Sequence, residues 1–270
     1  PGFARLVFGL FRPRRSLLGV VFGGEGVGPG ADVTKYKKGD RLFGWTSIMG
    51  LGGHAQFIAL PENGAFAPMP SEMSFTDAAA IPFGFGTARH FLSKANVSKG
   101  QRVLIYGASG AVGSAAVQLA RSLGAIVTGV CSTRNVELVR SLGASEVIDY
   151  TKDDLLAHRD QFDVVFETVG KLPFKDCVSL VKSKGIVITG SEMPAQMMVR
   201  AFAGKGGKNV TVVGGTAVES ADDMRHLAEL WQRQEIRAVI DSTYPLARIT
   251  EAHARAESWR KTGSVVVTMA

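Results

Sequence analysis

Residues 102–124 read RVLIYGASGAVGSAAVQLARSLG, and this stretch decides the fold of the chain. It opens with a short apolar run, residues 103–106, of the kind found in buried parallel strands. The glycines that follow suit a dinucleotide: Gly107 permits a tight turn, Gly110 lets the backbone approach a pyrophosphate, and Gly113 lets the next helix pack closely on the sheet. Backbone NH groups at the start of that helix would hold the anion, with the helix dipole behind them.

The elements on both sides of the glycines favour this interpretation. Apolar residues recur at three- and four-residue steps over residues 112–123, and Gly124 stands where a helix C-terminal cap is expected. Another apolar run, residues 126–130, follows at once. Glycines at this spacing are a weak signal alone, and the alternative is a parallel-sheet unit whose glycines serve packing only. The strand, turn, helix and strand together indicate a dinucleotide site.

The end of the second strand indicates which dinucleotide binds. An NAD site usually has an Asp or Glu about 20 residues after the glycines. Here the segment contains no acid and reads Ser132, Thr133, Arg134, Asn135. A guanidinium is suited to bidentate contact with a phosphate, so the segment predicts NADP(H). Two alternatives remain open: Arg134 is a solvated residue at a helix start, or Ser132, Thr133 or Asn135 is an ordinary helix cap.

Composition limits the class of protein. The chain has 270 residues, 46% of them hydrophobic, which is enough for a large core. It shows no run of 18 uncharged apolar residues, and its cysteines, Cys131 and Cys177, do not suggest a disulfide framework. We therefore expect a soluble, cytoplasmic protein with no membrane partner.

The net charge of +7 could indicate nucleic-acid binding. The basic residues are scattered among acids, however, and the clusters at residues 12–15 and 35–41 lack interleaved aromatic side chains beyond Tyr36. A basic surface that attracts an anionic cofactor is the favoured interpretation, and no nucleic-acid partner is expected.

The distribution of apolar and turn-forming residues divides the chain into two parts. Residues 1–86 are rich in Gly and Pro and carry short runs at 41–45 and 54–60, which predicts an all-β segment. From residue 88 strands and helices alternate, which requires a parallel sheet with helices on both faces. The predicted helices after the first are 136–142, one capped by Thr151 with Asp154, 174–181, one opened by Ser220 with Asp223, and 249–258; the predicted strands are 146–150, 163–168, 185–189, 210–213 and 265–268.

Several ordered motifs resemble one family. The chain is similar to the zinc-free, quinone oxidoreductase-like branch of the medium-chain dehydrogenases/reductases over nearly its whole length. The motifs are KGDRLFG at 38–44, GGHA at 52–55, AAAIP at 78–82 followed by Thr87, YGASGAVG at 106–113, CSTRN at 131–135, VIDY at 147–150 and FETVG at 166–170.

The resemblance implies an α/β fold: a Rossmann doubly wound parallel sheet (residues 88–239) inserted in a discontinuous, chaperonin-10-like, β-rich substrate domain (1–87 and 240–270). NADP(H) would lie in the cleft between the two domains, with residues 107–113 facing its pyrophosphate. Residues 132–135 and Tyr150 would surround the adenosine, and Thr87 would lie near the nicotinamide. Val169, Gly170, Gly190 and Ser191 would lie at the carboxyl edge of the sheet. Each strand-end glycine could instead be a plain turn. The cofactor-binding positions are Thr87, Gly107, Ala108, Ser109, Gly110, Ala111, Val112, Gly113, Ser132, Thr133, Arg134, Asn135, Tyr150, Val169, Gly170, Gly190 and Ser191.

The chain departs from the family pattern in two places. Gly19, Val20 and Val21 stand where zinc-dependent relatives have Gly-His-Glu, and no histidine is paired with cysteine at ligand spacing, so no zinc is expected. Family members also have several strands before the segment that resembles residues 12–19, so we expect part of the substrate domain to be absent. No catalytic proton donor can therefore be named.

The resemblance implies an NADPH-dependent oxidoreductase that passes hydride to a quinone, an enone or a similar activated acceptor. The alternatives are a zinc-free enoyl reductase and a non-catalytic NADPH-binding protein. The apolar, β-branched run at residues 210–213 resembles the family's edge strand, which predicts a homodimer through that edge.

Overall fold

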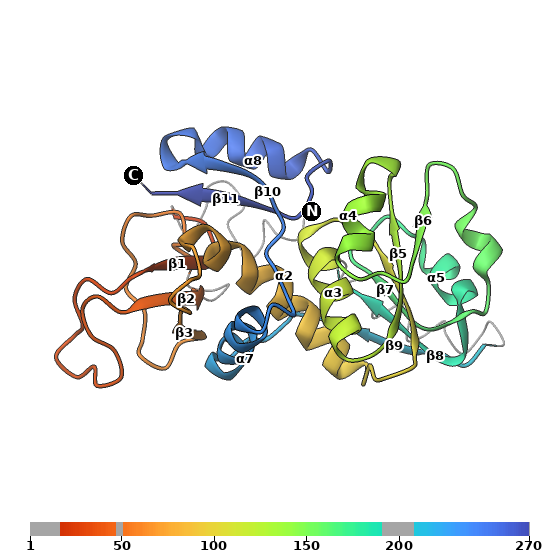
Figure 1. Cartoon of the computed structure of the whole chain (residues 1–270), viewed down its shortest axis with the longest axis horizontal. Coiled ribbons are helices and arrows are strands. Elements are labelled where there is room, and N and C mark those ends of the chain that lie inside the picture. Colours follow the sequence, from red (N-terminus) through yellow and green to blue (C-terminus); the bar gives the residue numbers. More distant parts are fainter. Residues whose placement is uncertain (1–16, 47–50, 191–207, 270) are drawn as a thin grey trace, which may run out of the picture.

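The larger sheet has the strand order of a dinucleotide-binding domain. The computed structural model describes residues 17–46, 51–190 and 208–269. Within them, six parallel strands follow the order β6-β5-β4-β7-β8-β9 (Figure 1). The order reverses between β4 and β7, and ligands bind at such a switch point. The strands are β4 Arg102–Tyr106, β5 Ile126–Cys131, β6 Glu146–Asp149, β7 Phe162–Glu167, β8 Val181–Thr189 and β9 Thr211–Gly214.

Helices cover both faces of this sheet, and the strands show why. Val103 and Ile105 of β4 belong to one apolar cluster, whereas Leu104 between them belongs to another. Alternate side chains of a strand point to opposite faces, so a strand that is apolar throughout must be covered twice. The predicted doubly wound α/β fold is confirmed. The helical elements are α3 Ala111–Ser122, η1 Thr133–Asn135, α4 Val136–Ser141, η2 Leu155–His158, α5 Phe174–Leu180 and α7 Ala221–Gln232.

Two smaller sheets complete the described chain. One is antiparallel and contains β1 Val21–Glu25, β2 Arg41–Trp45 and β3 Phe66–Pro68. The other is a parallel pair, β10 Ile240–Pro245 and β11 Ser264–Thr268, connected through η3 Leu246–Arg248 and α8 Ile249–Glu257. The proposed domain limits at residues 87 and 240 stay a prediction.

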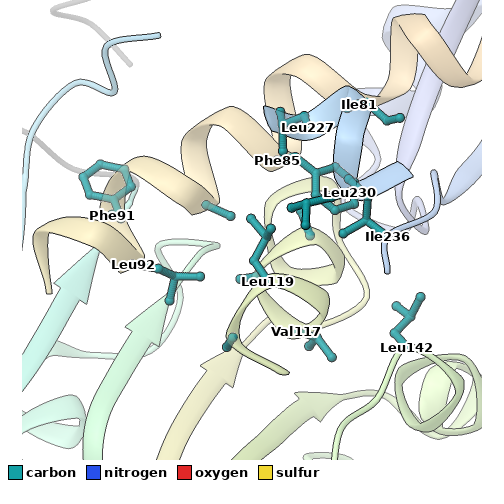
Figure 2. Packing of buried hydrophobic residues seen from close by; sticks show 14 of the residues in the cluster. Ile81, Phe85, Phe91, Leu92, Val117, Leu119, Leu142, Leu227, Leu230 and Ile236 are labelled. Carbon is teal, nitrogen blue, oxygen red and sulfur yellow. The ribbon is translucent and has the colours of Figure 1, made fainter. Parts of the chain in front are cut away.

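The longest described helix corrects the expectation that residues 1–86 are all-β. Helix α2 spans Phe75–Lys94 and includes Pro82, Gly84 and Gly86 in its interior. Ser74 caps it, since its side chain accepts a hydrogen bond from the Asp77 NH at 3.0 Å. Ile81 and Phe85 pack among α3 and α7 (Figure 2). Tertiary burial of this face stabilises a helix whose local sequence suggests breaks.

Two further expectations about local structure are wrong. The alternating run at residues 54–60 forms no strand in the described chain, and Phe57 within it is 72% exposed, so no sheet face covers its apolar positions. The helix expected from Thr151 starts later, as η2, because Asp154 is the residue that caps it through the Leu156 NH at 2.9 Å. Thr151 instead donates to the Asp149 carboxylate at 2.7 Å.

Candidate cofactor and active site

The phosphate loop, residues 107–113, is shaped by its glycines. Gly107 has φ +81°, and a Cβ placed there would lie 2.2 Å from Cγ2 of Val169. A Cβ on Gly113 would lie 2.1 Å from the Gly107 carbonyl oxygen. Both positions therefore require glycine for conformation or packing. At Gly110, by contrast, the nearest atom would be the Gly107 oxygen at 3.5 Å, an ordinary contact. Space beside Gly110 is left open.

The start of α3 fits an anionic group. Gly110 is the N-cap residue and has no side chain to satisfy the first NH groups, and the first turn contains no acidic residue. These NH groups of Ala111, Val112 and Gly113 have no intrahelical acceptor, because a helix leaves its first donors unpaired. An open approach at Gly110 and NH donors without an intrahelical acceptor beyond it are the two features that a bound pyrophosphate needs.

The loop after β5 is held by a buried carboxylate. Asp149, at the end of β6, accepts hydrogen bonds from the hydroxyls of Thr133 at 2.5 Å and Thr151 at 2.7 Å. The bond from Thr133 contributes most to lowering the pKa of Asp149, so this carboxyl is ionised at neutral pH. Tyr150 follows it and is 53% exposed, with its ring 6.5 Å from that of Tyr106. Thr133 and Tyr150 thus border the same end of the sheet.

Asn135 connects three segments. Its side-chain NH₂ group donates to the Ser109 hydroxyl at 2.9 Å, and its carbonyl accepts from the Thr262 hydroxyl at 3.2 Å. Ser132 and Asn135 are the N-cap residues of η1 and α4, as the helix-cap alternative expects, but neither side chain makes a capping hydrogen bond. The side chain of Asn135 instead fixes the phosphate loop to the loop after β5.

Residues 260–263 of the C-terminal segment complete this side of the site, and sequence reasoning missed them. The Arg134 guanidinium donates to the Arg260 carbonyl, so Arg134 is not simply solvated. The Gly263 NH donates to the Ser109 carbonyl at 2.8 Å, beside the phosphate loop. Burial lowers the pKa of Lys261, whose ammonium donates to the Gly263 carbonyl at 2.6 Å. In the sequence, the only sign of this contribution to the site is the basic pair Arg260 and Lys261 before Thr262.

Asp241 of β10 anchors that segment. Its carboxylate accepts from Nε of Arg255 at 2.7 Å and from the Thr262 NH at 2.8 Å. The Arg255 hydrogen bonds are the main cause that lowers the pKa of Asp241 to about 2. The small parallel sheet therefore places residues 260–263 against the phosphate loop.

The turn after β7 supports the phosphate loop from the other side. Glu167 is buried and accepts from the NH groups of Val169 at 3.0 Å and Gly170 at 2.7 Å. Gly170 has φ +82°, which the turn requires. The Gly190 NH donates to the Glu167 carbonyl at 3.0 Å, so the ends of β7 and β8 lie together. Ser191 lies outside the described residues.

Helix α2 lies against the start of α3. A Cβ on Gly84 would be 2.4 Å from the Ala111 carbonyl oxygen, so the two backbones meet beside the phosphate loop. Thr87 follows Gly84 by about one turn and is half-buried. The structure thus brings Thr87 into the neighbourhood of the predicted site, and its contact with the nicotinamide stays a prediction.

Comparison with known proteins places the chain in a family. Residues 142–267 match the family described as zinc-binding dehydrogenase. The chain is 30% identical to a chloroplast envelope quinone oxidoreductase homolog of Arabidopsis thaliana over 254 residues, which cover 90% of this chain and 77% of that protein. The chain belongs to the quinone oxidoreductase-like branch of the medium-chain dehydrogenases/reductases. This confirms the resemblance found in the motifs.

Two further proteins are similar to this quinone oxidoreductase-like chain. An NADPH-dependent alkenal/one oxidoreductase of Arabidopsis thaliana is 30% identical over 249 residues, and the chain spans 60% of that relative's length and 88% of its own. The solved quinone oxidoreductase from Coxiella burnetii is 25% identical with a TM-score of 0.84, covering 98% of this chain and 83% of that one.

The description of the matched family mentions zinc, and a zinc site needs a group of ligating side chains. Among the residues that the structure describes, no three His, Cys, Asp or Glu side chains gather as metal ligands would. Val20 and Val21 lie at the start of the β1 sheet, and Cys131 and Cys177 are buried free thiols. Burial raises the pKa of Cys131 to about 11 and that of Cys177 to about 12. A zinc-independent reaction stays a prediction.

Across the ranges that the structure describes, no helix combines the length and apolarity needed to cross a bilayer.

Proposed function

We propose that this chain is an NADPH-dependent reductase that transfers hydride to a quinone, an enone or a similarly activated acceptor without zinc. The observation that carries the proposal is the phosphate loop at the switch point of the sheet, with open space at Gly110 and NH donors without a side-chain cap at the start of α3. NADPH would supply the hydride when bound. The named activities of the quinone and alkenal/one oxidoreductase relatives support this acceptor class.

Each part of the site has a role in this proposal. The NH groups that open α3 hold the pyrophosphate, and Ser109 is fixed for this by Asn135 and Gly263. Arg134, with Ser132 and Thr133, surrounds the 2′-phosphate, because no acid follows β5 to bind free ribose hydroxyls. Tyr150 borders the adenosine, while Val169, Gly170 and Gly190 line the edge between the two halves of the cofactor.

We also propose a homodimer through β9. This strand is the last in the sheet order, and residues 210–213 are largely apolar. An unpaired apolar edge strand invites aggregation, and pairing with a second copy removes that hazard. A cytoplasmic location remains an expectation from the sequence.

Consumption of NADPH in the presence of quinones, enones and enoyl thioesters tests the proposal. We expect oxidation with an electron-poor quinone or enone, with protein purified without added metal and shown by elemental analysis to hold no stoichiometric zinc. Turnover restricted to enoyl thioesters would favour an enoyl reductase. Tight NADPH binding without oxidation across the whole panel would reject the reductase and favour a binding protein.

A further inference from the structure

Several buried polar atoms find no hydrogen-bond partner among the residues that the structure describes, and three of them lie on or beside helix α2. These three are Nε1 of Trp45, Nε2 of His90 and Oε1 of Glu219. Trp45 ends β2, His90 lies on α2, and Glu219 precedes α7, so the fold brings them from distant parts of the sequence. Burying an unpaired polar atom is costly, and its presence calls for an explanation, of which a catalytic role is one.

The atoms of Trp45 and Glu219 meet over one glycine of α2. A Cβ built on Gly86 would lie 3.3 Å from Nε1 of Trp45, 3.1 Å from Cγ of Glu219 and 3.8 Å from its Oε1. The first two of these contacts are tight, so any larger residue at this position would press on the indole and the carboxyl side chain. Glycine at position 86 therefore lets the indole NH and the carboxyl group approach the same point of α2.

His90 lies one turn further along the same face of α2. Residues four apart in a helix are neighbours, so His90 follows Gly86 on this face. Nδ1 of His90 accepts a hydrogen bond from the Val218 NH at 3.4 Å, next to Glu219. Because Nδ1 is an acceptor, Nε2 of the neutral imidazole carries the proton and is a donor. Trp45, His90 and Glu219 thus offer two NH donors and one carboxyl group.

If Thr87 contacts the nicotinamide as the family resemblance implies, the cluster of Trp45, His90 and Glu219 lies at the end of the cofactor site where hydride would be transferred. Glu219 lies in the connection that leaves the carboxyl end of β9, and Gly86 is adjacent to Thr87. The Trp45 ring packs at 5.6 Å from that of Phe83, which is 43% exposed. The same helix face therefore reaches the surface of the molecule at Phe83.

We propose that Glu219 is the proton donor to the acceptor, and that the NH groups of Trp45 and His90 hold the acceptor oxygen. The proposal rests on the reductase function proposed above. Hydride from NADPH carries two electrons to the acceptor and leaves the nicotinamide oxidised. Negative charge then develops on the conjugated oxygen, and two positioned donors stabilise it. The O–H bond of Glu219 breaks as a new O–H bond forms on the acceptor, and the carboxylate regains its proton from solvent.

The electrostatic surroundings agree with this role. Burial raises the pKa of Glu219 to about 7, so its carboxyl group can carry a proton near neutral pH. Burial also lowers the pKa of His90, which keeps the imidazole neutral. The other ionisable groups on α2 are Asp77, Arg89 and Lys94, and the charge of Lys94 also lowers the pKa of His90. On α7 they are Asp222, Asp223, Arg225, His226 and Glu229; Asp223 pairs with Arg89, Asp222 pairs with Arg225, and burial lowers the pKa of the half-buried His226. On β2, Arg41 donates to the carbonyls of Ser71 and Met73.

The test compares Glu219→Gln with Glu229→Gln, a substitution of an exposed glutamate on α7. For the wild type we expect turnover to fall as pH rises above 7, because the donor loses its proton. Glu219→Gln should reduce turnover by about 100-fold or more and remove this pH dependence, whereas Glu229→Gln should change neither. Glu219→Asp, which keeps an acid at shorter reach, should retain the pH dependence at a lower rate. NADPH affinity, measured by fluorescence titration, should stay the same in all variants.

A stability measurement tests the ionisation independently of turnover. Because the folded-state pKa is raised from 4.5 to about 7, the folded protein retains a proton that the unfolded chain has lost, and stability should fall as pH rises through this window. Glu219→Gln should remove that part of the pH dependence of Tm. A Glu219→Gln variant with wild-type turnover and pH profile would overturn the proton-donor role. A wild type that oxidises no NADPH with any acceptor would instead reject the proposed reductase, and the role of Glu219 would fall with it.

Discussion

Substitution by alanine should lower the stability of the fold at Gly113 and weaken NADPH binding at Gly110. At Gly113 the new Cβ would lie 2.1 Å from the Gly107 oxygen, 2.8 Å from the Gly107 carbonyl carbon and 2.9 Å from Cα of Ala108. All three are backbone atoms, so no side chain can move to make room and α3 must shift away from the turn. Overpacking of this kind costs about 1–3 kcal/mol. In a domain approaching this size each kcal/mol lowers Tm by about 2–4 °C.

Gly110→Ala should leave the fold intact and weaken the cofactor. Its φ of −79° and ψ of 176° suit any residue, and the added Cβ makes only an ordinary contact. Its stability should therefore stay within about 0.5 kcal/mol of wild type. A methyl group at the open approach would displace the pyrophosphate from the NH donors of α3. Loss of a charge-assisted hydrogen bond is worth about 1.5–3 kcal/mol, which weakens NADPH by one to two orders of magnitude at about 1.4 kcal/mol per tenfold.

Thermal unfolding without cofactor and calorimetric titration with NADPH measure the two effects separately. Gly28→Ala is the matched control, since a Cβ there meets nothing within 4 Å and Gly28 lies outside the phosphate loop. It should change neither Tm nor affinity. Wild-type NADPH affinity in Gly110→Ala would refute the assignment of the open space to the pyrophosphate. Wild-type stability in Gly113→Ala would refute the packing argument.

Three other outcomes follow from the structure. Arg134→Ala should weaken NADPH by about one to two orders of magnitude, from the same 1.5–3 kcal/mol contact, and leave NADH almost unchanged; equal loss for both cofactors in titrations would mean that its bond to the Arg260 carbonyl supports the fold instead. Val212→Lys in β9 should convert a dimer into a monomer in sedimentation experiments, and a strictly monomeric wild type at micromolar concentration would count against the β9 interface. Because Arg255 lowers the pKa of Asp241 to about 2, this carboxylate should stabilise the fold above pH 3.8 and lose that contribution as pH falls towards 2; Asp241→Asn should flatten the acid side of the Tm profile, and an unchanged profile would contradict the pairing.

Local signals were enough to predict the doubly wound half of the chain. The run from residue 102 to 124 predicts β4, the phosphate loop and α3, because strand burial, a tight turn and helix amphipathicity are each visible within a few residues. The structure confirms the packing reasons for Gly107 and Gly113. The capping pair Ser220 and Asp223 likewise predicts the start of α7, where both halves of a capping box form.

What the sequence alone determined, then, is the parallel sheet and its glycine turn, whose causes lie close together in the chain. Only the tertiary structure decided that Gly84 and Gly86 belong to a helix, since close packing on the Ala111 backbone and on the side chains of Trp45 and Glu219 explains those glycines. The same holds for residues 260–263, which reach Ser109 only through the small C-terminal sheet. Such contacts join residues far apart in sequence, and no local periodicity records which distant segment will supply the partner.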